Sequence, residues 1–530
     1  MLGAPGVPFL FVAAVYLVVA TANIALPGVY MDAVNPDYLA VRLLNPAHAP
    51  FMEWVLLGND LLGHRVPLLI TVYHGAQTLW FGLPFLWLFG TSVEGLRLTH
   101  AMFGLGLLAA FYFCLRRVGV PVLAAAAAAI VLALDPSFSF AFRTQSYITM
   151  SGTVWLLLCV ALIAAPAPVR EKRWLLAGFL AGFAWSAYFV HAFWLGALVP
   201  AVLLLTRGDE QRWRARARFA MGLTIGVLPY VVGYWRVAYK LGGWSAFVDF
   251  YRHTLDGLGA FASTIGFGER LRFACRVVAG VFDNAWHHGM MFREWVGVPG
   301  ASLKLALVLG VPIVAWAFAE HRRGASPGAR LAIALPAAFV VVALLLGNRL
   351  SGHHYVVLVP VVYAAAAVCC RDAYASTAAH HRSLMRGALA LTAVVVAAIN
   401  LAGQSAEARR LLDTGGVGLM SDAINRFGTD LATIYPKPYL LAPDWGLALP
   451  AIFLTRGTMS VYMDADPRRV RALRCKGTDI ALALIHRRDE RRTEWTRLLG
   501  TDPARITPYR QRDGTVLFEV AVYPATVGDC

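Results

Sequence analysis

The run PFLFVAAVYLVVATANIALPGVYMDAVNPDYLAVRLL, residues 8–44, joins an apolar segment directly to two carboxylates. The apolar part begins near Pro8 and ends near Leu26, which is close to the ~20 residues that a membrane-spanning helix needs. It is too long for a signal peptide and no small-residue cleavage site follows it, so we interpret it as a retained helix. Asp32 and Asp37 are therefore expected just beyond a helix end, at the face of a membrane.

The composition of the whole chain agrees with a membrane protein. Its 530 residues are 58% hydrophobic and 15% charged, and the mean hydropathy is +0.59. A soluble chain of this length would be more charged and would divide into several domains. Membrane topology explains much of the net charge of +16, so we expect the lipid bilayer as a partner and no nucleic acid.

Apolar runs separated by short charged or Pro/Gly-rich links predict a polytopic α-helical membrane protein with about 11 transmembrane helices. The runs cover residues 8–26, 96–115, 120–135, 150–165, 174–189, 191–206, 219–238, 302–319, 331–347, 354–370 and 387–402. The apolar stretch 66–90 is an alternative twelfth span. An odd number of spans is favoured because it keeps the later basic links on the same side of the membrane as the earlier ones, the inside.

Arginine and lysine gather in alternate links, and this pattern predicts the orientation of the chain. The basic links include 207–218 and 371–386, whereas the links between them contain few basic residues. Basic links face the cytoplasm. We therefore expect a multi-pass protein of the cell inner (plasma) membrane, with a cytoplasmic N-terminus and Asp32 outside.

Three larger pieces then lie on the outer face, at 27–95, 239–300 and 403–530. The first is rich in Pro and Trp, and its short apolar runs predict helices in the membrane interface. In the third, YLLAP, MSVYM, DIALALIH and TVLFEVAVY predict strands, while DPRRVRALR and RRDERRTEWTRLL predict amphipathic helices. The expected domains are a transmembrane domain over 1–402 and a small extracytoplasmic α/β domain over 403–530.

Motifs for metal or nucleotide chemistry are missing from the sequence. There is no CxxC or HExxH, and neighbouring histidines such as His353-His354 point about 100° apart on a helix. There is also no GxGxxG or P-loop to hold a nucleotide. We predict no metal site and no cofactor; a divalent cation is compatible with the sequence, but nothing indicates one.

The order of these elements resembles the GT-C glycosyltransferases, in particular their bacterial branch, the protein mannosyltransferase and aminoarabinose transferase type. The segments that resemble the family are the acidic motif, LWLFGTSVEGLRLTHAMFGLGLLAAFYFCLRR (86–117), DPSFSFAFRTQSY (135–147), GNRLSGHHYVVLVP (347–360) and APDWGLALPAIFLTRG (442–457). The resemblance covers most of the membrane part. It implies an integral-membrane inverting transferase that takes a sugar from a polyprenyl-phosphate donor on the outer face.

Such a transfer needs a base for the proton of the acceptor, and the lipid tail keeps the donor phosphate at the interface. A catalytic acid must therefore lie immediately outside a helix end, where Asp32 is expected. Relatives usually have an Asp-Glu pair in this loop, whereas Ala33 follows Asp32 here. We predict Asp32 as the general base and leave Asp37 as the alternative, although its Asn-Pro-Asp context is also a common turn. A solvated turn explains both acids without any function.

Cationic and polar groups at outer helix ends are expected to hold the departing phosphate. The candidate substrate-binding residues are Arg349, His353, His354, Tyr355, Arg97 and Arg143. Snorkelling side chains and an aromatic belt explain the same residues without a ligand.

Two other classes of protein would also be polytopic and basic. A lipid-linked sugar flippase or other transporter is expected to show repeat symmetry, and we find none. A non-catalytic membrane assembly protein would explain the outer domain but not the acidic motif. Neither the sugar nor the acceptor, which would be a glycan, lipid or protein, is indicated by the sequence.

Overall fold

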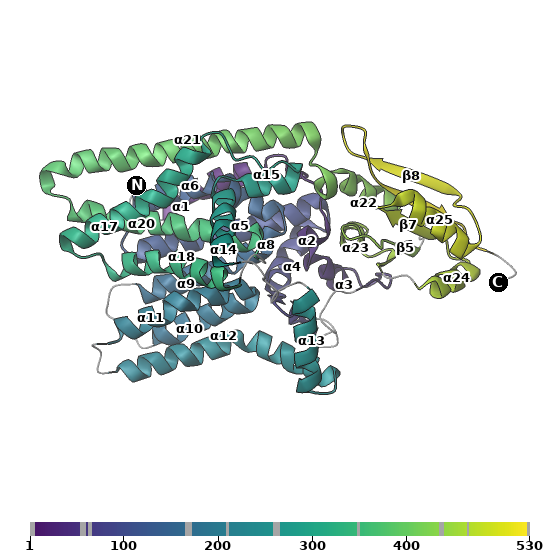
Figure 1. Ribbon diagram of the computed structural model, residues 1–530, viewed down its shortest axis with the longest axis horizontal. Helices are drawn as coiled ribbons and strands as arrows, with labels where there is room; N and C mark the ends of the chain where they lie inside the picture. Colours follow the sequence, from purple (N-terminus) through teal and green to yellow (C-terminus); the bar gives the residue numbers. More distant parts are fainter. Residues whose placement is uncertain are drawn as a thin grey trace.

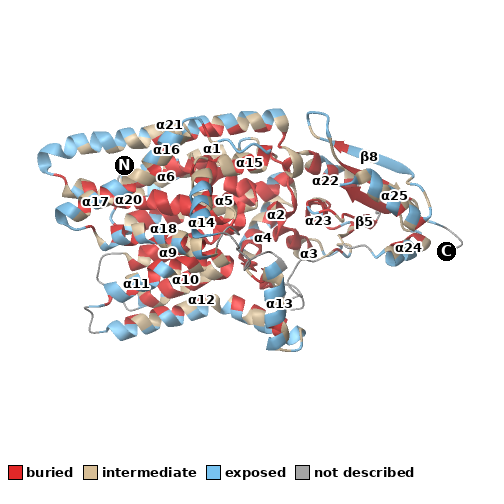
Figure 2. Cartoon of the chain, in the orientation of Figure 1, coloured by how far each residue is buried: buried red, intermediate tan, exposed pale blue. Residues whose placement is uncertain are grey.

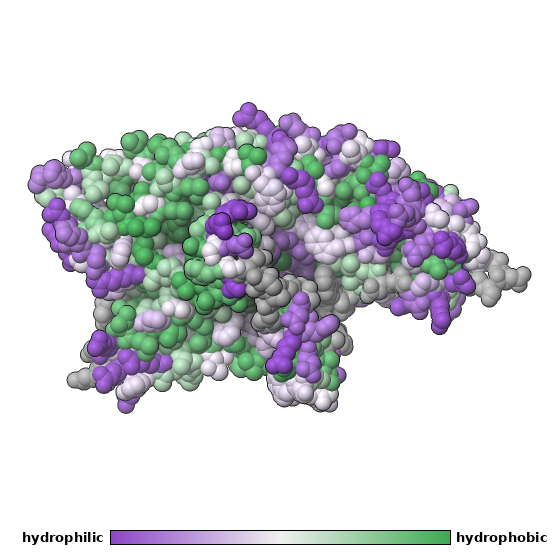
Figure 3. Space-filling view, in the orientation of Figure 1, coloured by the Kyte–Doolittle hydropathy of each residue, from purple (hydrophilic) through white to green (hydrophobic). Residues whose placement is uncertain are grey.

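The computed structural model describes residues 6–52, 60–61, 66–164, 172–207, 211–257, 266–346, 350–433, 439–463 and 466–526. A bundle of helices forms the larger part, and the C-terminal residues form a smaller α/β part beside one end of it (Figure 1). Hydrophobic side chains cover much of the bundle surface, whereas hydrophilic ones gather over the α/β part (Figure 3). A lipid-facing bundle with a water-facing domain accounts for this division.

A helix lies at each of the predicted spans. These helices are α1 (Gly6–Thr21), α5 (Val93–Arg117), α6 (Val122–Ala133), α8 (Ser146–Ser151) with α9 (Thr153–Ile163), α10 (Lys172–Ala187), η4 (Phe189–Trp194) with α11 (Leu195–Leu205), α12 (Arg212–Lys240), α16 (Ala301–Leu305) with α17 (Val311–Arg323), α18 (Pro327–Leu346), α20 (Leu358–Ser376) and α21 (Arg382–Thr414). Within the described residues, seven helices are long and apolar enough to cross a membrane, or eight if one bent pair is counted. The polytopic helical fold is confirmed, whereas the count of eleven crossings stays a prediction.

The bent pair is broken at Asp135. The helix α6 and the segment Pro136–Arg143, formed by α7 (Pro136–Ser139) and η3 (Phe140–Arg143), meet at an angle of 70°. The Asp135 carboxylate accepts from the Ser137 amide at 2.9 Å, and Pro136 occupies the first helical position. Both features start a new helix. The break directs Arg143 back toward the end of α1.

The described part of 27–95 folds into short elements rather than a twelfth span. They are α2 (Met31–Val34), η1 (Asp37–Leu39), α3 (Ala40–Leu44), β1 (Asp60–Leu61), β2 (Val66–Pro67), β3 (Leu69–Thr71), β4 (His74–Gly75) and α4 (Gln77–Phe89). With 13 residues, α4 is ~20 Å long and too short to cross a membrane alone. The piece 239–300 contributes α13 (Trp244–Gly257), α14 (Phe267–Phe282) and α15 (Ala285–Phe292), and α14 packs against α19 (Gly352–Tyr355).

The C-terminal part, which we call the outer domain after its predicted location, contains a five-stranded sheet in the order β6-β5-β7-β9-β8. Its strands are β5 (Tyr439–Leu441), β6 (Ser460–Tyr462), β7 (Ile480–Leu484), β8 (Arg505–Arg510) and β9 (Val516–Tyr523), and its helices are α22 (Ala423–Thr433), α23 (Ala448–Leu454), α24 (Pro467–Cys475) and α25 (Arg488–Leu499). The predicted α/β domain is confirmed, although β8, α22 and α23 were not predicted. The helix α21 continues past residue 403 to Thr414.

Both faces of this sheet are covered, as the buried strands in Figure 2 show. In β7, Leu482 packs with α24 and α25 on one face, while Ala481 packs with α22 and α23 on the other. The core on the side of α22 and α23 also contains Tyr30 and Tyr38 of the segment after α1. The acidic segment is therefore packed into the junction between the outer domain and the bundle.

Candidate active site

Two buried arginines hold the segment that contains both acids. Arg143 donates to the carbonyls of Ala20 at 3.0 Å and Leu26 at 3.3 Å. Arg97 donates to the Pro27 carbonyl at 3.1 Å. Carbonyls near a helix C-terminus lack intrahelical partners, so the two guanidinium groups fix the path of the chain from α1 to α2. The described hydrogen bonds of both side chains go to the backbone, and phosphate binding by either stays a prediction.

The outer domain holds the same segment from another side. The Asn425 side chain in α22 accepts from the Val29 amide at 3.0 Å and donates to the Ala25 carbonyl at 2.8 Å. A Cβ atom on Gly28 would lie 2.0 Å from the Ser421 carbonyl oxygen. Only glycine allows so close an approach of two backbones.

Asp37 is fully buried and hydrogen-bonded. Its Oδ2 accepts from the Tyr147 hydroxyl at 2.7 Å and lies 2.8 Å from His100 Nε2. The rings of His100 and Tyr147 stack with centroids 3.7 Å apart. On the other side, Oδ1 would be 3.5 Å from a Cβ on Gly82 of α4. This carboxylate has no exposed surface and links η1 to α5 and α8.

Asp32 lies five residues earlier in a different environment. It is half-buried in the first turn of α2, and its carboxylate has no hydrogen-bond partner among the described residues. Burial raises the pKa of Asp32 to about 6. Burial is the larger cause that raises the pKa of Tyr30 and of Tyr73, and the negative charge of Asp32 raises both further. The unpaired carboxylate therefore lies near two phenols.

Hydrogen bonds join this segment to the start of α19. The Tyr30 hydroxyl donates to Gln145 Oε1 at 2.6 Å, and Gln145 Nε2 donates to His353 Nδ1 at 3.0 Å. The Ser351 hydroxyl lies 2.5 Å from the same nitrogen. Because Nδ1 accepts, the proton of the neutral His353 ring is on Nε2. The predicted residue His353 is thereby connected to Tyr30, two residues before Asp32.

The other predicted substrate residues have different positions. The His354 ring lies 3.9 Å from the ring of His353. Tyr355 is fully buried and packs edge-on against Phe339 with centroids 5.6 Å apart. Arg349 lies outside the described residues. The two histidines are together near the acidic segment, and Tyr355 packs into the bundle.

One cation of this site was not predicted. Arg293 follows α15 with φ 63°, an uncommon conformation outside glycine, and its side chain is exposed. Its Nε would lie 3.1 Å from a Cβ on Gly418. The pKa of Tyr30, which burial and Asp32 raise, is lowered in part by the charge of Arg293. Trp445 of the outer domain packs on Tyr30 with ring centroids 5.5 Å apart. The site thus combines an acid, a cation and aromatic rings.

Comparison with known proteins identifies the fold. No protein-family model matches the chain, and no curated protein matches it in sequence. The crystal structure of ArnT from Cupriavidus metallidurans bound to undecaprenyl phosphate has a TM-score of 0.63 and 16% identity, over 98% of this chain and 99% of that chain. The crystal structure of the same protein in the apo state has a TM-score of 0.62 and 15% identity, over the same shares of the two chains. This chain has the fold of ArnT. The predicted GT-C fold is confirmed.

Several residues of this candidate site had a weak signal in the sequence or none. Gln145 and Tyr147 belong to DPSFSFAFRTQSY, a segment already noted for its resemblance, and polar groups at that membrane face could have been proposed. His100 lies within an apolar span and Arg293 within a long outer loop, where neither is distinctive. Across the described ranges, no three His, Cys, Asp or Glu side chains are placed to hold a metal ion.

Proposed function

We propose that the chain is a membrane glycosyltransferase that moves a sugar from a polyprenyl-phosphate donor to an acceptor on the outer face of the membrane. The observation that supports this most is the half-buried Asp32 carboxylate, which no described residue hydrogen-bonds, in the same site as the exposed cation Arg293. ArnT, which shares the fold over nearly the whole chain, was solved with undecaprenyl phosphate bound. The sugar would be a hexose or a pentose, and the acceptor a glycan, lipid or protein.

Asp32 is the general base in this proposal. The acceptor atom attacks the anomeric carbon while Asp32 takes its proton. The bond from the anomeric carbon to the phosphate oxygen breaks, and polyprenyl phosphate leaves with the electron pair. A single displacement inverts the anomeric configuration. With a pKa of about 6, Asp32 is mostly ionised at neutral pH and still basic enough to accept a proton.

Cationic groups must meet the charge that grows on the departing phosphate. Arg293 forms no ion pair among the described residues, and His353 has its Nε2 proton available as a donor. Arg349 remains a third candidate, two residues before Ser351. Arg97 and Arg143 would act by holding the Asp32 segment.

A transfer assay tests this proposal. Purified protein would be incubated with undecaprenyl-phosphate hexoses and pentoses, labelled in the sugar, together with an extract of cell-envelope acceptors. We expect label to move from the lipid to the extract. In liposomes, a donor that crosses the bilayer and keeps its sugar would contradict the proposal and favour a flippase.

Arg293→Ala should lower kcat/KM for the donor about tenfold or more, because a charge-assisted contact to phosphate is lost. The KM for the acceptor should change little. Arg293→Lys should recover part of the loss as a point charge without the planar fork. Arg456→Ala is the matched control, since Arg456 is another exposed arginine with positive φ, at 55°. Equal donor kcat/KM in the two alanine variants would remove Arg293 from the site.

Catalysis on the outer face requires the predicted orientation, which cysteine labelling can test. Cys275 is an exposed free cysteine, so Cys275→Ser provides the background. We expect an impermeant maleimide to label Asp489→Cys in intact cells, because this outer-domain side chain is 89% exposed. Arg212→Cys, at the start of α12, should react only after permeabilisation. Labelling at 212 from outside would invert the topology and move Asp32 to the cytoplasmic face.

A further inference from the structure

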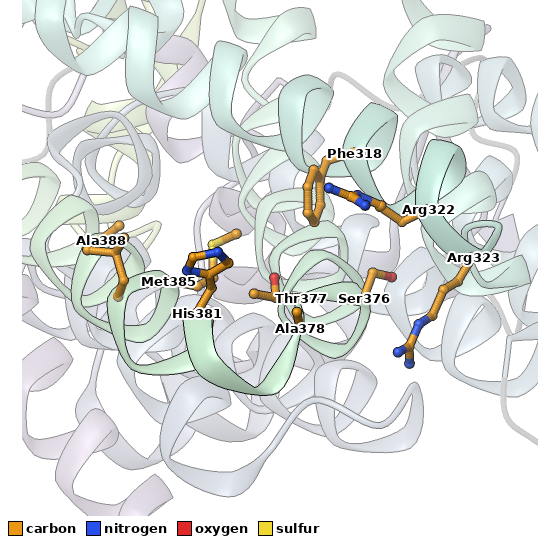
Figure 4. Close-up of a pocket in the computed structure, with 10 residues that line it drawn as sticks. Phe318, Arg322, Arg323, Ser376, Thr377, Ala378, His381, Met385 and Ala388 are labelled. Carbon is orange, nitrogen blue, oxygen red and sulfur yellow. The ribbon is translucent and has the colours of Figure 1, made fainter.

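A cavity lies far from Asp32, where the ends of α17 and α20 meet the start of α21. Its volume is about 560 Å³ (Figure 4). The helix α20 separates it from the candidate active site: α20 begins just after Tyr355 and ends at Ser376, about 28 Å further along its axis. In Figure 1 these helix ends lie at the far end of the bundle from the outer domain. Nothing in the proposed transfer reaction uses this cavity.

Basic side chains contribute to the wall of the cavity from more than one helix end. Arg322, Arg323 and His381 all contribute to its wall and are exposed. The Arg322 guanidinium lies 5.7 Å from the centre of the Phe318 ring, beside which Figure 4 shows it. None of the described residues accepts a hydrogen bond from the Arg322 guanidinium.

No described carboxylate neutralises these arginines. On the same helix, Glu320 pairs with Arg330 at 2.8 Å. The described hydrogen bond of Arg323 goes to the Ala375 carbonyl at 3.3 Å, which is a neutral acceptor. The cavity therefore has a local excess of positive charge.

Beyond His381, the side of the cavity formed by α21 is apolar and continues along that helix (Figure 4). Leu384, Met385 and Ala388 of α21 line it, and Leu384 is 73% exposed. Further along α21, Leu391 and Val394 are also exposed large hydrophobic residues. The basic cavity thus lies beside a row of apolar side chains, which we call the apolar path, that runs along α21. This helix is long and apolar enough to span the membrane.

We propose that this cavity binds an anionic phospholipid of the surrounding membrane. Its phosphate would contact Arg322 and Arg323, and one acyl chain would lie against Leu384 and Ala388. Basic pockets between helices at the headgroup level suit such lipids. The apolar path favours a phospholipid over a soluble anion, because only a lipid has an acyl chain that can cover these exposed apolar side chains. This inference concerns the end of the bundle opposite Asp32 and holds whichever reaction the protein performs.

Native mass spectrometry of delipidated protein in a neutral detergent would test it. With dioleoyl-phosphatidylglycerol and dioleoyl-phosphatidylcholine as probes, we expect the first to bind about tenfold tighter. The double variant Arg322→Gln/Arg323→Gln should lose this preference. The control Arg212→Gln/Arg214→Gln removes the same charge from exposed residues outside the cavity and should keep it.

Arg322→Lys/Arg323→Lys keeps the charge and should also bind phosphatidylglycerol preferentially. If it does, loss of the preference in the glutamine variant is due to the missing charge and not to misfolding caused by substitution at these positions. An unchanged preference in the glutamine variant would overturn the proposal. So would displacement of the lipid by millimolar glycerol phosphate, because that result would indicate a site for soluble anions.

Discussion

Asp32→Asn should lower sugar transfer by a factor of about 10² or more, because the amide cannot accept the proton of the acceptor. The substitution changes little volume, and the carboxylate has no described hydrogen bond to lose. Burial already disfavours the charge of Asp32, so at neutral pH the melting temperature should equal or exceed that of the wild type. Transfer at the wild-type rate by folded Asp32→Asn would exclude this residue as the base.

The same residue predicts a pH dependence. Burial raises the pKa of Asp32 to about 6, and only the ionised form accepts a proton. Below about pH 6, kcat/KM for wild-type transfer should fall about tenfold per pH unit, and above it the rate should level off. Initial rates between about pH 4.5 and pH 8 would measure this, and the residual activity of Asp32→Asn should lack the acidic limb.

Asp37→Ala should instead destabilise the protein. It leaves His100 Nε2 buried without its partner, while the Tyr147 hydroxyl loses the Asp37 carboxylate and keeps only the Asn35 carbonyl, at 3.0 Å. An unsatisfied buried group such as His100 Nε2 costs about 1–3 kcal/mol. We expect a lower melting temperature in detergent and activity that falls in proportion to the folded fraction. A fully stable but inactive Asp37→Asn would make Asp37 the base.

Hydropathy located the helices of the bundle because a long apolar run has few other solutions in a membrane. The break at Asp135 was less evident, since apolar residues continue on both sides of it. The Asp135-Pro136 pair is nevertheless a helix-start signature that could have marked it. In the outer domain, β8 contains Pro508, which argues against a central strand; β8 is an edge strand, where proline is tolerated.

The position of the two acids after α1 could be predicted from the sequence, but their different environments could not. Asp37 meets His100 and Tyr147 across 63 and 110 residues of chain. Arg143 reaches the Ala20 carbonyl across 123 residues. Contacts over such separations depend on how helices pack and bend, which apolar periodicity does not describe.

Binding and turnover measured on the same preparations would decide the role of Asp32. Wild type and Asp32→Asn would be compared for affinity to undecaprenyl phosphate and for release of that lipid from a sugar-labelled donor in the presence of acceptor extract. We expect equal affinities, with lipid release about 10² slower in the variant. Equal release by the two proteins, or lipid binding with no release by the wild type with any donor sugar, would contradict sugar transfer with Asp32 as its base.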